Sequence, residues 1–79
     1  QMYTVEFESD ASVVVIMDET DSHEDVEVVL TDNNEVYIRQ YEESLDSHEL
    51  ICLSYQQLMD LVASINSSEG MFKLQFVRS

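Results

Sequence analysis

Hydrophobic and polar positions follow a helical period in one stretch of the chain, residues 54–66. Apolar side chains recur there at intervals of three and four residues, which places them on one face of a helix: Leu58, Leu61, Val62 and Ile65, with Tyr55 and Met59 at the margins. Ser54 stands at the start of the stretch and Gln57 follows three residues later, which is the spacing of a capping box. The pattern predicts one amphipathic helix that ends near Asn66.

The rest of the chain has the features of strands. Several segments alternate between apolar and polar residues or form short apolar runs: residues 3–8, 13–17, 26–30, 35–41, 50–53 and 71–77. In the first segment Tyr3, Val5 and Phe7 share one face, which is typical of a half-buried strand. The second segment, residues 13–17, is apolar throughout and predicts a central strand that is covered on both faces.

One helix among such strands predicts an α+β fold. An amphipathic helix must bury its apolar face, and only a sheet is present to receive it. We therefore expect a mainly antiparallel sheet of five or six strands with the helix packed on one face, in the order β-β-β-β-β-α-β. The last strand carries Phe72, Leu74 and Phe76 on one face, so we expect these residues and the helical stripe to form the core.

A chain of 79 residues predicts a single compact acidic domain, over residues 2–79, with Gln1 preceding the natural start at Met2. Its mass of 9.1 kDa permits one thin core and no deep enclosed active site. The one cysteine, Cys52, lies in an apolar segment, so we expect a buried thiol, a reducing compartment and a cytoplasmic location. No stretch approaches the roughly 20 apolar residues of a membrane-spanning helix.

Charge is the most unusual property of this chain. Seventeen Asp and Glu residues stand against three Lys and Arg residues, which gives a formal net charge of −14. Such a charge repels nucleic acid and anionic membranes and attracts basic surfaces. We therefore expect no direct binding of nucleic acid or membrane, and we expect a basic protein surface as the partner. The alternative is that the charge serves solubility alone.

A four-residue sequence, Asp-Ser-His-Glu, occurs twice, at residues 21–24 and 46–49. The first copy lies in one expected acidic loop, residues 18–25, and the second overlaps another, residues 42–47. Two tandem hairpins with matching tips would explain the repetition. The alternative is chance among residue types that are common in loops.

No catalytic or metal-binding motif accompanies these acids. Residues 18–25 lack the glycine and the ligand spacing of a calcium loop, and two histidines with one cysteine are too few for a typical zinc site. Pairs of carboxylates carry little information among so many acids, and no neighbouring cation activates Cys52. We therefore expect no cofactor, no metal and no enzymatic activity.

The distribution of the acids favours a binding protein. Acids on one face of a strand repeat at about 6.6–6.8 Å, comparable to the separation of successive phosphates, and exposed tyrosines among carboxylates are typical interface anchors. The predicted partner-binding residues are Glu24, Asp25, Glu27, Tyr37, Tyr41, Glu42, Glu43, Asp46 and Glu49. We expect them to occupy a basic site on a DNA-binding protein, as DNA-mimic inhibitors of similar size and charge that phages encode do.

Two other functions are compatible with the sequence. One is a structural or assembly module that forms a homodimer through a sheet edge, with its charge serving solubility. The other is a small metal-dependent enzyme. Salt-dependent binding to a DNA-binding protein, a doubled mass without such a partner, and stoichiometric metal would distinguish the three.

Overall fold

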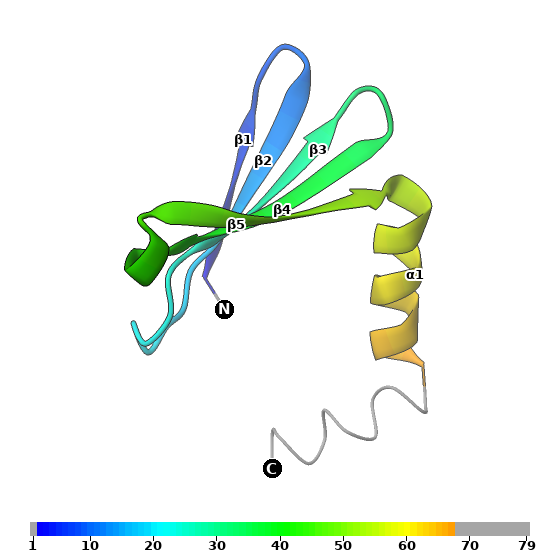
Figure 1. Cartoon of the computed structure of the whole chain (residues 1–79). Helices are drawn as coiled ribbons and strands as arrows, with labels where there is room; N and C mark the ends of the chain where they lie inside the picture. The colour runs from blue at the N-terminus through cyan, green and yellow to red at the C-terminus, as the bar shows by residue number, and fades with distance from the viewer. Residues whose placement is uncertain (1, 68–79) are drawn as a thin grey trace.

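The computed structural model describes residues 2–67, which form five strands followed by one helix (Figure 1). A short 3-10 helix, η1 (Glu43–Leu45), lies between the last two strands. The other elements are β1 (Tyr3–Phe7), β2 (Ala11–Ile16), β3 (Val26–Thr31), β4 (Glu35–Glu42), β5 (Ser47–Ser54) and α1 (Tyr55–Asn66). This arrangement confirms the predicted α+β class and the order of these elements. The predicted strand over residues 71–77 lies outside the described residues.

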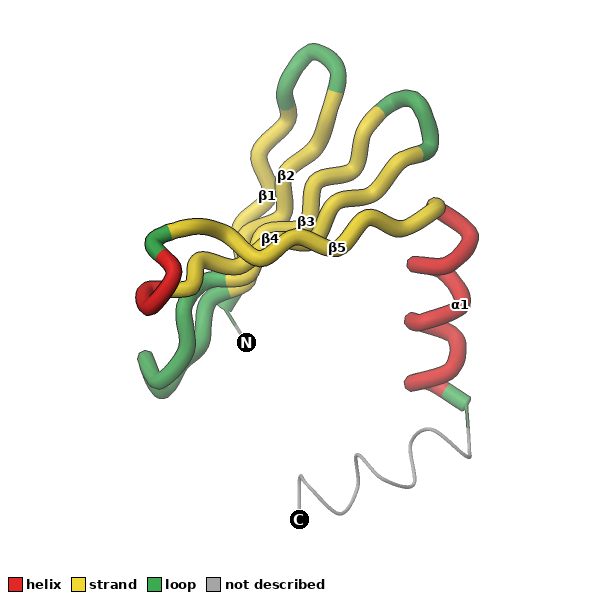
Figure 2. The backbone as a smooth tube through the Cα atoms, in the orientation of Figure 1, coloured by secondary structure: helices red, strands yellow, loops and turns green. Residues whose placement is uncertain are grey.

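The sheet is an antiparallel meander, in which each strand pairs with the next one along the chain (Figure 2). Alternate connections of a meander lie at the same end of the sheet. The β1–β2 and β3–β4 turns therefore share one end, and the β2–β3 loop shares the other end with η1. At the β3–β4 turn, Asn34 has a left-handed φ of 66°, as expected for the asparagine-rich turn signal there.

The register divides the strand residues between two faces, because directly opposed residues of an antiparallel pair point to the same side. We call the first the apolar face; it carries Tyr3, Val5, Phe7, Val14, Ile16, Val26, Val28, Leu30, Val36, Ile38, Ile51 and Leu53, and its polar members are Ser12, Gln40, Glu42, Ser47 and Glu49. We call the second the mixed face; it includes Glu6, Val13, Val15, Glu27, Val29, Glu35, Tyr37, Arg39, Tyr41, His48, Leu50 and Cys52.

The helix begins where the sequence predicts. Ser54 Oγ accepts a hydrogen bond from the Gln57 backbone N–H at 3.1 Å, and Gln57 Oε1 accepts one from the Ser54 N–H at 3.0 Å. These two bonds complete the capping box, which satisfies backbone donors that the first turn leaves free. The Tyr55 N–H donates to the Asn34 carbonyl at 3.3 Å, so the start of α1 is held against the β3–β4 turn.

The predicted packing of the helix is wrong for most of its apolar stripe. Leu61, Val62 and Ile65 are 47%, 44% and 40% exposed, whereas Leu58 is half-buried. The physical reason is that α1 follows β5 without an intervening loop, so that its main contacts are with β5 and β4, at one side of the sheet (Figure 1). The predicted partners of the stripe, Phe72, Leu74 and Phe76, lie outside the described residues.

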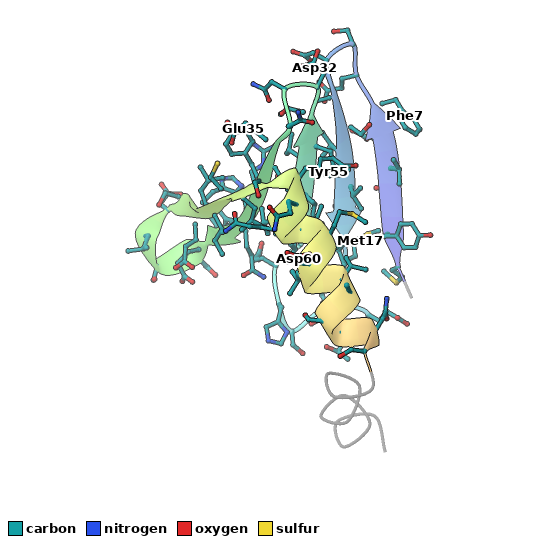
Figure 3. The ribbon with its side chains drawn as sticks, turned by 90° about the vertical axis from the view of Figure 1, so that its right-hand side faces the viewer. Phe7, Met17, Asp32, Glu35, Tyr55 and Asp60 are labelled. Carbon is teal, nitrogen blue, oxygen red and sulfur yellow. The ribbon has the colours of Figure 1, made fainter. Side chains whose placement is uncertain are left out.

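The sheet is also less covered than the sequence predicts. Only Val13 and Val36 are buried among residues 2–67, so the expectation that β2 is covered on both faces is wrong. Phe7, expected to be half-buried, is 82% exposed at the outer edge of the sheet (Figure 3). Cys52, expected to be buried, is exposed because it lies on the mixed face of the edge strand β5.

The second acidic loop is shorter than predicted. Residues 42–47 were expected to form a loop, but Glu42 still pairs with Ser47, so β4 and β5 extend to η1. Strand β5 consequently spans eight residues and contains His48 and Glu49. These two residues point to opposite faces of the sheet, because successive side chains alternate along a strand.

Candidate functional site

The two copies of Asp-Ser-His-Glu lie at the same end of the sheet (Figures 1 and 2). The first copy is in the long β2–β3 loop, and the second runs from the end of η1 into β5. The meander explains this placement, because it brings every second connection to the same end. The sequence repeat therefore marks one site rather than two separate loops.

The two copies also begin with the same turn. Asp21 and Asp46 have left-handed φ values of 56° and 49°, and their backbone N–H groups donate to carbonyls three residues earlier, Asp18 O at 3.0 Å and Glu43 O at 3.1 Å. Aspartate is among the residue types that tolerate this conformation. Beyond this turn the copies differ, because the first stays in a loop and the second enters a strand.

Asp18 organises the long loop. Its carboxylate accepts hydrogen bonds from the backbone N–H groups of Thr20, Ser22 and His23 at 2.9–3.1 Å, and His23 Nδ1 lies 2.9 Å from its Oδ2. The hydrogen bond with His23 and those from Thr20 hold the pKa of Asp18 well below its usual range. The carboxylate therefore stays ionised at physiological pH and anchors the loop that presents the first copy.

Two adjoining hollows, each of about 320 Å³, flank this loop. Both are lined by Asp21, His23, Glu24 and Tyr41. The first is completed by Val15, Asp25, Glu27 and His48, and the second by Ser22, Gln40, Glu42 and Glu43. We call this region the acidic hollows. It gathers carboxylates from β3, β4 and the two connections at this end of the sheet.

One cation faces these carboxylates. Arg39 Nε donates to Glu27 Oε1 at 2.6 Å, across a directly opposed pair of β3 and β4. Arg39 is the only lysine or arginine within residues 2–67. The acidic hollows therefore keep a strong excess of negative charge, which the Arg39–Glu27 pair reduces only at one side.

Tyr41 is held firmly within this region. Its hydroxyl donates to Asp46 Oδ1 at 2.6 Å, and its ring meets that of His48 edge to face, with centroids 5.6 Å apart. The hydrogen bond to Asp46 raises the pKa of the Tyr41 phenol, with smaller contributions from burial and the charge of Glu24. A fixed aromatic ring among carboxylates is suited to anchoring a protein partner.

Further hydrogen bonds position the walls of the hollows. Gln40 Nε2 donates to the Glu24 carbonyl at 3.0 Å, which ties the long loop to β4. Glu42 Oε1 accepts from the Ser44 hydroxyl at 2.8 Å and from its backbone N–H at 3.3 Å, which caps η1. Both walls are therefore fixed by bonds to residues of the sheet.

The structure brings most of the predicted partner-binding residues together. Those that line the acidic hollows are Glu24, Asp25, Glu27, Tyr41, Glu42 and Glu43, and Asp46 joins them through its bond to Tyr41. Tyr37 lies farther along β4, opposite Val29 and Cys52. Glu49 lies on the apolar face, opposite Gln40, and lines neither hollow.

Sequence reasoning missed Asp18, Asp21, His23 and His48 as members of this region. The repeated Asp-Ser-His-Glu sequence contained the signal for three of them. Combined with the alternation of loop positions in a meander, it would have placed both histidines at one end of the sheet. Nothing in the sequence pattern indicates that Asp18 accepts the hydrogen bonds of the loop.

The described residues offer little to metal or thiol chemistry. Within residues 2–67, no group of three or more His, Cys, Asp and Glu side chains is arranged to hold a metal ion. The Cys52 thiol donates to Glu35 Oε2 at 3.2 Å, and this bond raises the pKa of Cys52. A thiol with a raised pKa is mostly protonated at neutral pH and is a poor nucleophile.

No helix among the described residues is long and apolar enough to cross a membrane. Comparisons with curated proteins and with solved structures gave no match. A comparison with protein families did, over residues 4–64, which span β1 to β5 and most of α1. The chain therefore belongs to the family described as "Domain of unknown function (DUF8831)".

Proposed function

We propose that this protein is a non-enzymatic binding protein whose acidic hollows occupy a basic site on a partner protein. The observation that carries the proposal is the clustering of carboxylates from two connections and two strands, with Arg39 the only lysine or arginine in residues 2–67. Opposite charge across an interface accelerates association and selects the partner.

A DNA-binding protein is the partner that this surface fits best. Such a protein grips phosphates with lysine and arginine, and carboxylates held on a sheet offer the same sign of charge. The Tyr41 ring, fixed by Asp46 and His48, adds an anchor that can enter a pocket among basic residues. In this proposal the protein acts as a DNA mimic and inhibits its partner by occupying the site for DNA.

The test is capture from a lysate at low salt, followed by elution with a salt step. The wild-type protein should retain basic DNA-binding proteins, and a short duplex DNA should compete with it for each of them. The affinity for the partner should fall steeply as the salt concentration rises, because bound counterions are released when the two charged surfaces meet. Simultaneous binding of the duplex and this protein to one partner would refute the mimic.

A matched pair of variants locates the binding surface. The triple variant Glu24→Gln, Asp25→Asn and Glu43→Gln removes three charges at the acidic hollows. The control Glu8→Gln, Asp10→Asn and Asp32→Asn removes three charges from the opposite end of the sheet, where Asp32 lies at a turn (Figure 3). Only the first variant should slow association; equal effects would show that net charge, and not this surface, determines binding.

The free edge of β5 favours a second candidate, an assembly module. This strand is eight residues long, is mostly exposed, and pairs only with β4 among the described residues. A long exposed edge is a template for pairing with another strand. In this alternative the protein forms a homodimer edge to edge, its charge serves solubility, and no basic partner is retained in the capture experiment.

A further inference from the structure

Both histidines of this chain line the first of the acidic hollows. His23 comes from the β2–β3 loop and His48 from β5, one in each copy of the Asp-Ser-His-Glu sequence. Histidine is the side chain that ordinarily changes its charge between pH 5 and 8, whereas carboxylates, lysine and arginine ordinarily titrate outside this range. The charge of this surface can therefore change under conditions that leave most charges of the chain unaltered.

The long loop allows His23 to gain a proton without losing its bond. His23 Nδ1 lies 2.9 Å from Asp18 Oδ2, and the His23 backbone N–H donates to the same oxygen at 2.9 Å. Because Asp18 stays ionised at physiological pH, it can only accept, so Nδ1 carries a hydrogen and Nε2 is the atom that takes up a second proton. The side chain is 76% exposed, so solvent protons reach it. Protonation therefore changes the charge of His23 and keeps its position.

His48 is positioned by packing. It lies directly opposite Tyr41 in the β4–β5 pair, and the two rings meet edge to face with their centroids 5.6 Å apart. The Tyr41 hydroxyl donates to Asp46, which fixes the ring against which His48 packs. His48 is exposed, so it also exchanges protons with solvent while it lines the hollow.

Charged groups from the neighbouring elements surround these two rings. The β2–β3 loop contributes Asp18, Asp21, Glu24 and Asp25, and β3 contributes Glu27. Strand β4 contributes Tyr41, Glu42 and Arg39, which is bonded to Glu27, and η1 and its cap contribute Glu43 and Asp46. Four of these carboxylates line the first hollow together with both histidines, and Arg39 offsets one of the four. Two protonated histidines would offset two more.

We propose that His23 and His48 make the acidic hollows a pH-dependent binding surface, which holds a basic partner at neutral pH and releases it as the pH falls to about 5.5. This inference rests on the proposed function, because it concerns the regulation of the same site. The lysines and arginines of a partner keep their charge over this range. Acidification therefore weakens the attraction from one side only, by reducing the negative charge of the hollows.

The same coupling acts in the opposite direction. The cations of a bound partner disfavour protonation of the histidines that they approach. Binding must therefore displace protons from the histidines, because the effect of protons on binding and the effect of binding on protons are one coupling free energy. Proton release on binding is thus a second measurable consequence of the proposal.

The first experiment uses a peptide of about ten lysines as the probe, because its charge is constant over the range tested. Calorimetry measures the Kd of the peptide at about pH 7.5 and about pH 5.5, at one ionic strength. The Kd of the wild-type protein should rise about 10-fold at the lower pH, since each exposed histidine contributes a few-fold. A Kd that stays constant or falls at the lower pH would overturn the proposal.

A double variant that keeps the local contacts isolates the two histidines. His23→Asn retains an N–H donor in place of Nδ1, and His48→Phe retains a ring against Tyr41. Neither new side chain titrates, so the Kd of the double variant should change less than about 2-fold between the two pH values. Each single variant should lose part of the pH dependence, and circular dichroism checks that all three are folded. An unchanged pH dependence in these variants would assign the effect to carboxylates and overturn the proposal.

Proton release is measured by calorimetry at about pH 6.5, the ordinary midpoint for histidine, in two buffers of different ionisation enthalpy. The wild-type protein should release protons when it binds the peptide, and the double variant should release fewer. Equal release from the two proteins would contradict a role for the histidines.

The triple variants of the proposed function separate the two proposals. At about pH 7.5, Glu24→Gln, Asp25→Asn and Glu43→Gln together should weaken peptide binding more than Glu8→Gln, Asp10→Asn and Asp32→Asn do. If they do so but the Kd of the wild-type protein does not depend on pH, only the pH dependence is wrong. If the two triple variants bind the peptide equally, the acidic hollows are not the binding surface, and both proposals are wrong.

Discussion

Arg39 and Glu27 face each other across β4 and β3, and the guanidinium Nε lies 2.6 Å from the carboxylate oxygen Oε1. Both side chains are partly exposed, at 43% and 29%, so the pair is screened by solvent. Its larger consequence is electrostatic, because it neutralises one carboxylate of the acidic hollows.

Replacing Arg39 separates the effect of the ion pair on the charge of the acidic hollows from its effect on stability. Arg39→Gln should lower the free energy of unfolding by no more than about 1 kcal/mol, the usual range for an exposed ion pair. The same change should tighten binding to a basic partner, because it releases the charge of Glu27. Glu27→Gln breaks the same pair but should weaken binding. Urea unfolding measures the change in stability, and a binding titration measures the change in affinity. If Arg39→Gln and Glu27→Gln shift the affinity in the same direction, the proposed site is wrong.

Asp18 should make stability depend on pH in the acid range. Folding lowers the pKa of Asp18, so its ionised form stabilises the folded state above the unfolded value of about 3.9, and this contribution is lost as pH falls toward the folded value. Asp18→Asn should lower the urea midpoint at pH 7, and the difference from wild type should shrink below about pH 4.

Asp32→Asn provides the control for this titration. The structure of residues 2–67 shows no side-chain hydrogen bond for Asp32, which lies at the β3–β4 turn (Figure 3). This substitution should change the urea midpoint at pH 7 much less than Asp18→Asn does. Equal losses from the two substitutions would show that the loop gains no stability from the bonds to Asp18.

Tyr41 should ionise late in an alkaline titration. Its pKa is raised because the hydroxyl donates to Asp46, so the protonated phenol stabilises the fold below the unfolded pKa, and this contribution is lost as pH rises through the folded value. Ultraviolet absorbance should record a phenol step above the usual range. Tyr41→Phe should remove this step, whereas Tyr37→Phe should leave it. If the step is lost in Tyr37→Phe and kept in Tyr41→Phe, the bond between Tyr41 and Asp46 is not its cause.

Moderate salt should stabilise the protein. Seventeen acids in a chain of 79 residues repel one another, and salt at 0.1 M screens exposed charges beyond about 10 Å. The melting temperature should therefore rise between low and moderate salt. The measurement is thermal unfolding by circular dichroism at a fixed protein concentration. A melting temperature that falls over this range would show that attractive pairs outweigh the repulsion.

Local interactions explain why the sequence predicts the elements well. The helix start at Ser54 depends on Gln57, three residues away, and the β3–β4 turn depends on an asparagine that tolerates positive φ. The two-residue period placed Tyr37 and Tyr41 on one face, as the register confirms. Such features involve only neighbouring residues, so a sequence determines them by itself.

Pairing between strands decided which residues line the acidic hollows. The pairing of Glu42 with Ser47 extended β5, so alternation along the strand sent His48 to the acidic hollows and Glu49 to the opposite face. The order of the meander then brought His23 and His48 to line one hollow. These positions depend on contacts between residues far apart in the chain, which periodicity cannot specify.

The sequence by itself determined an α+β chain with a strong negative charge and an apolar helical stripe. Only the tertiary structure decided which residues of the chain that stripe contacts. Amphipathicity requires that Leu61 and its neighbours be buried against some surface, but it does not say which. The direct connection of β5 to α1 holds the start of the helix beside β4 and β5, and Leu61, Val62 and Ile65 stay exposed among residues 2–67.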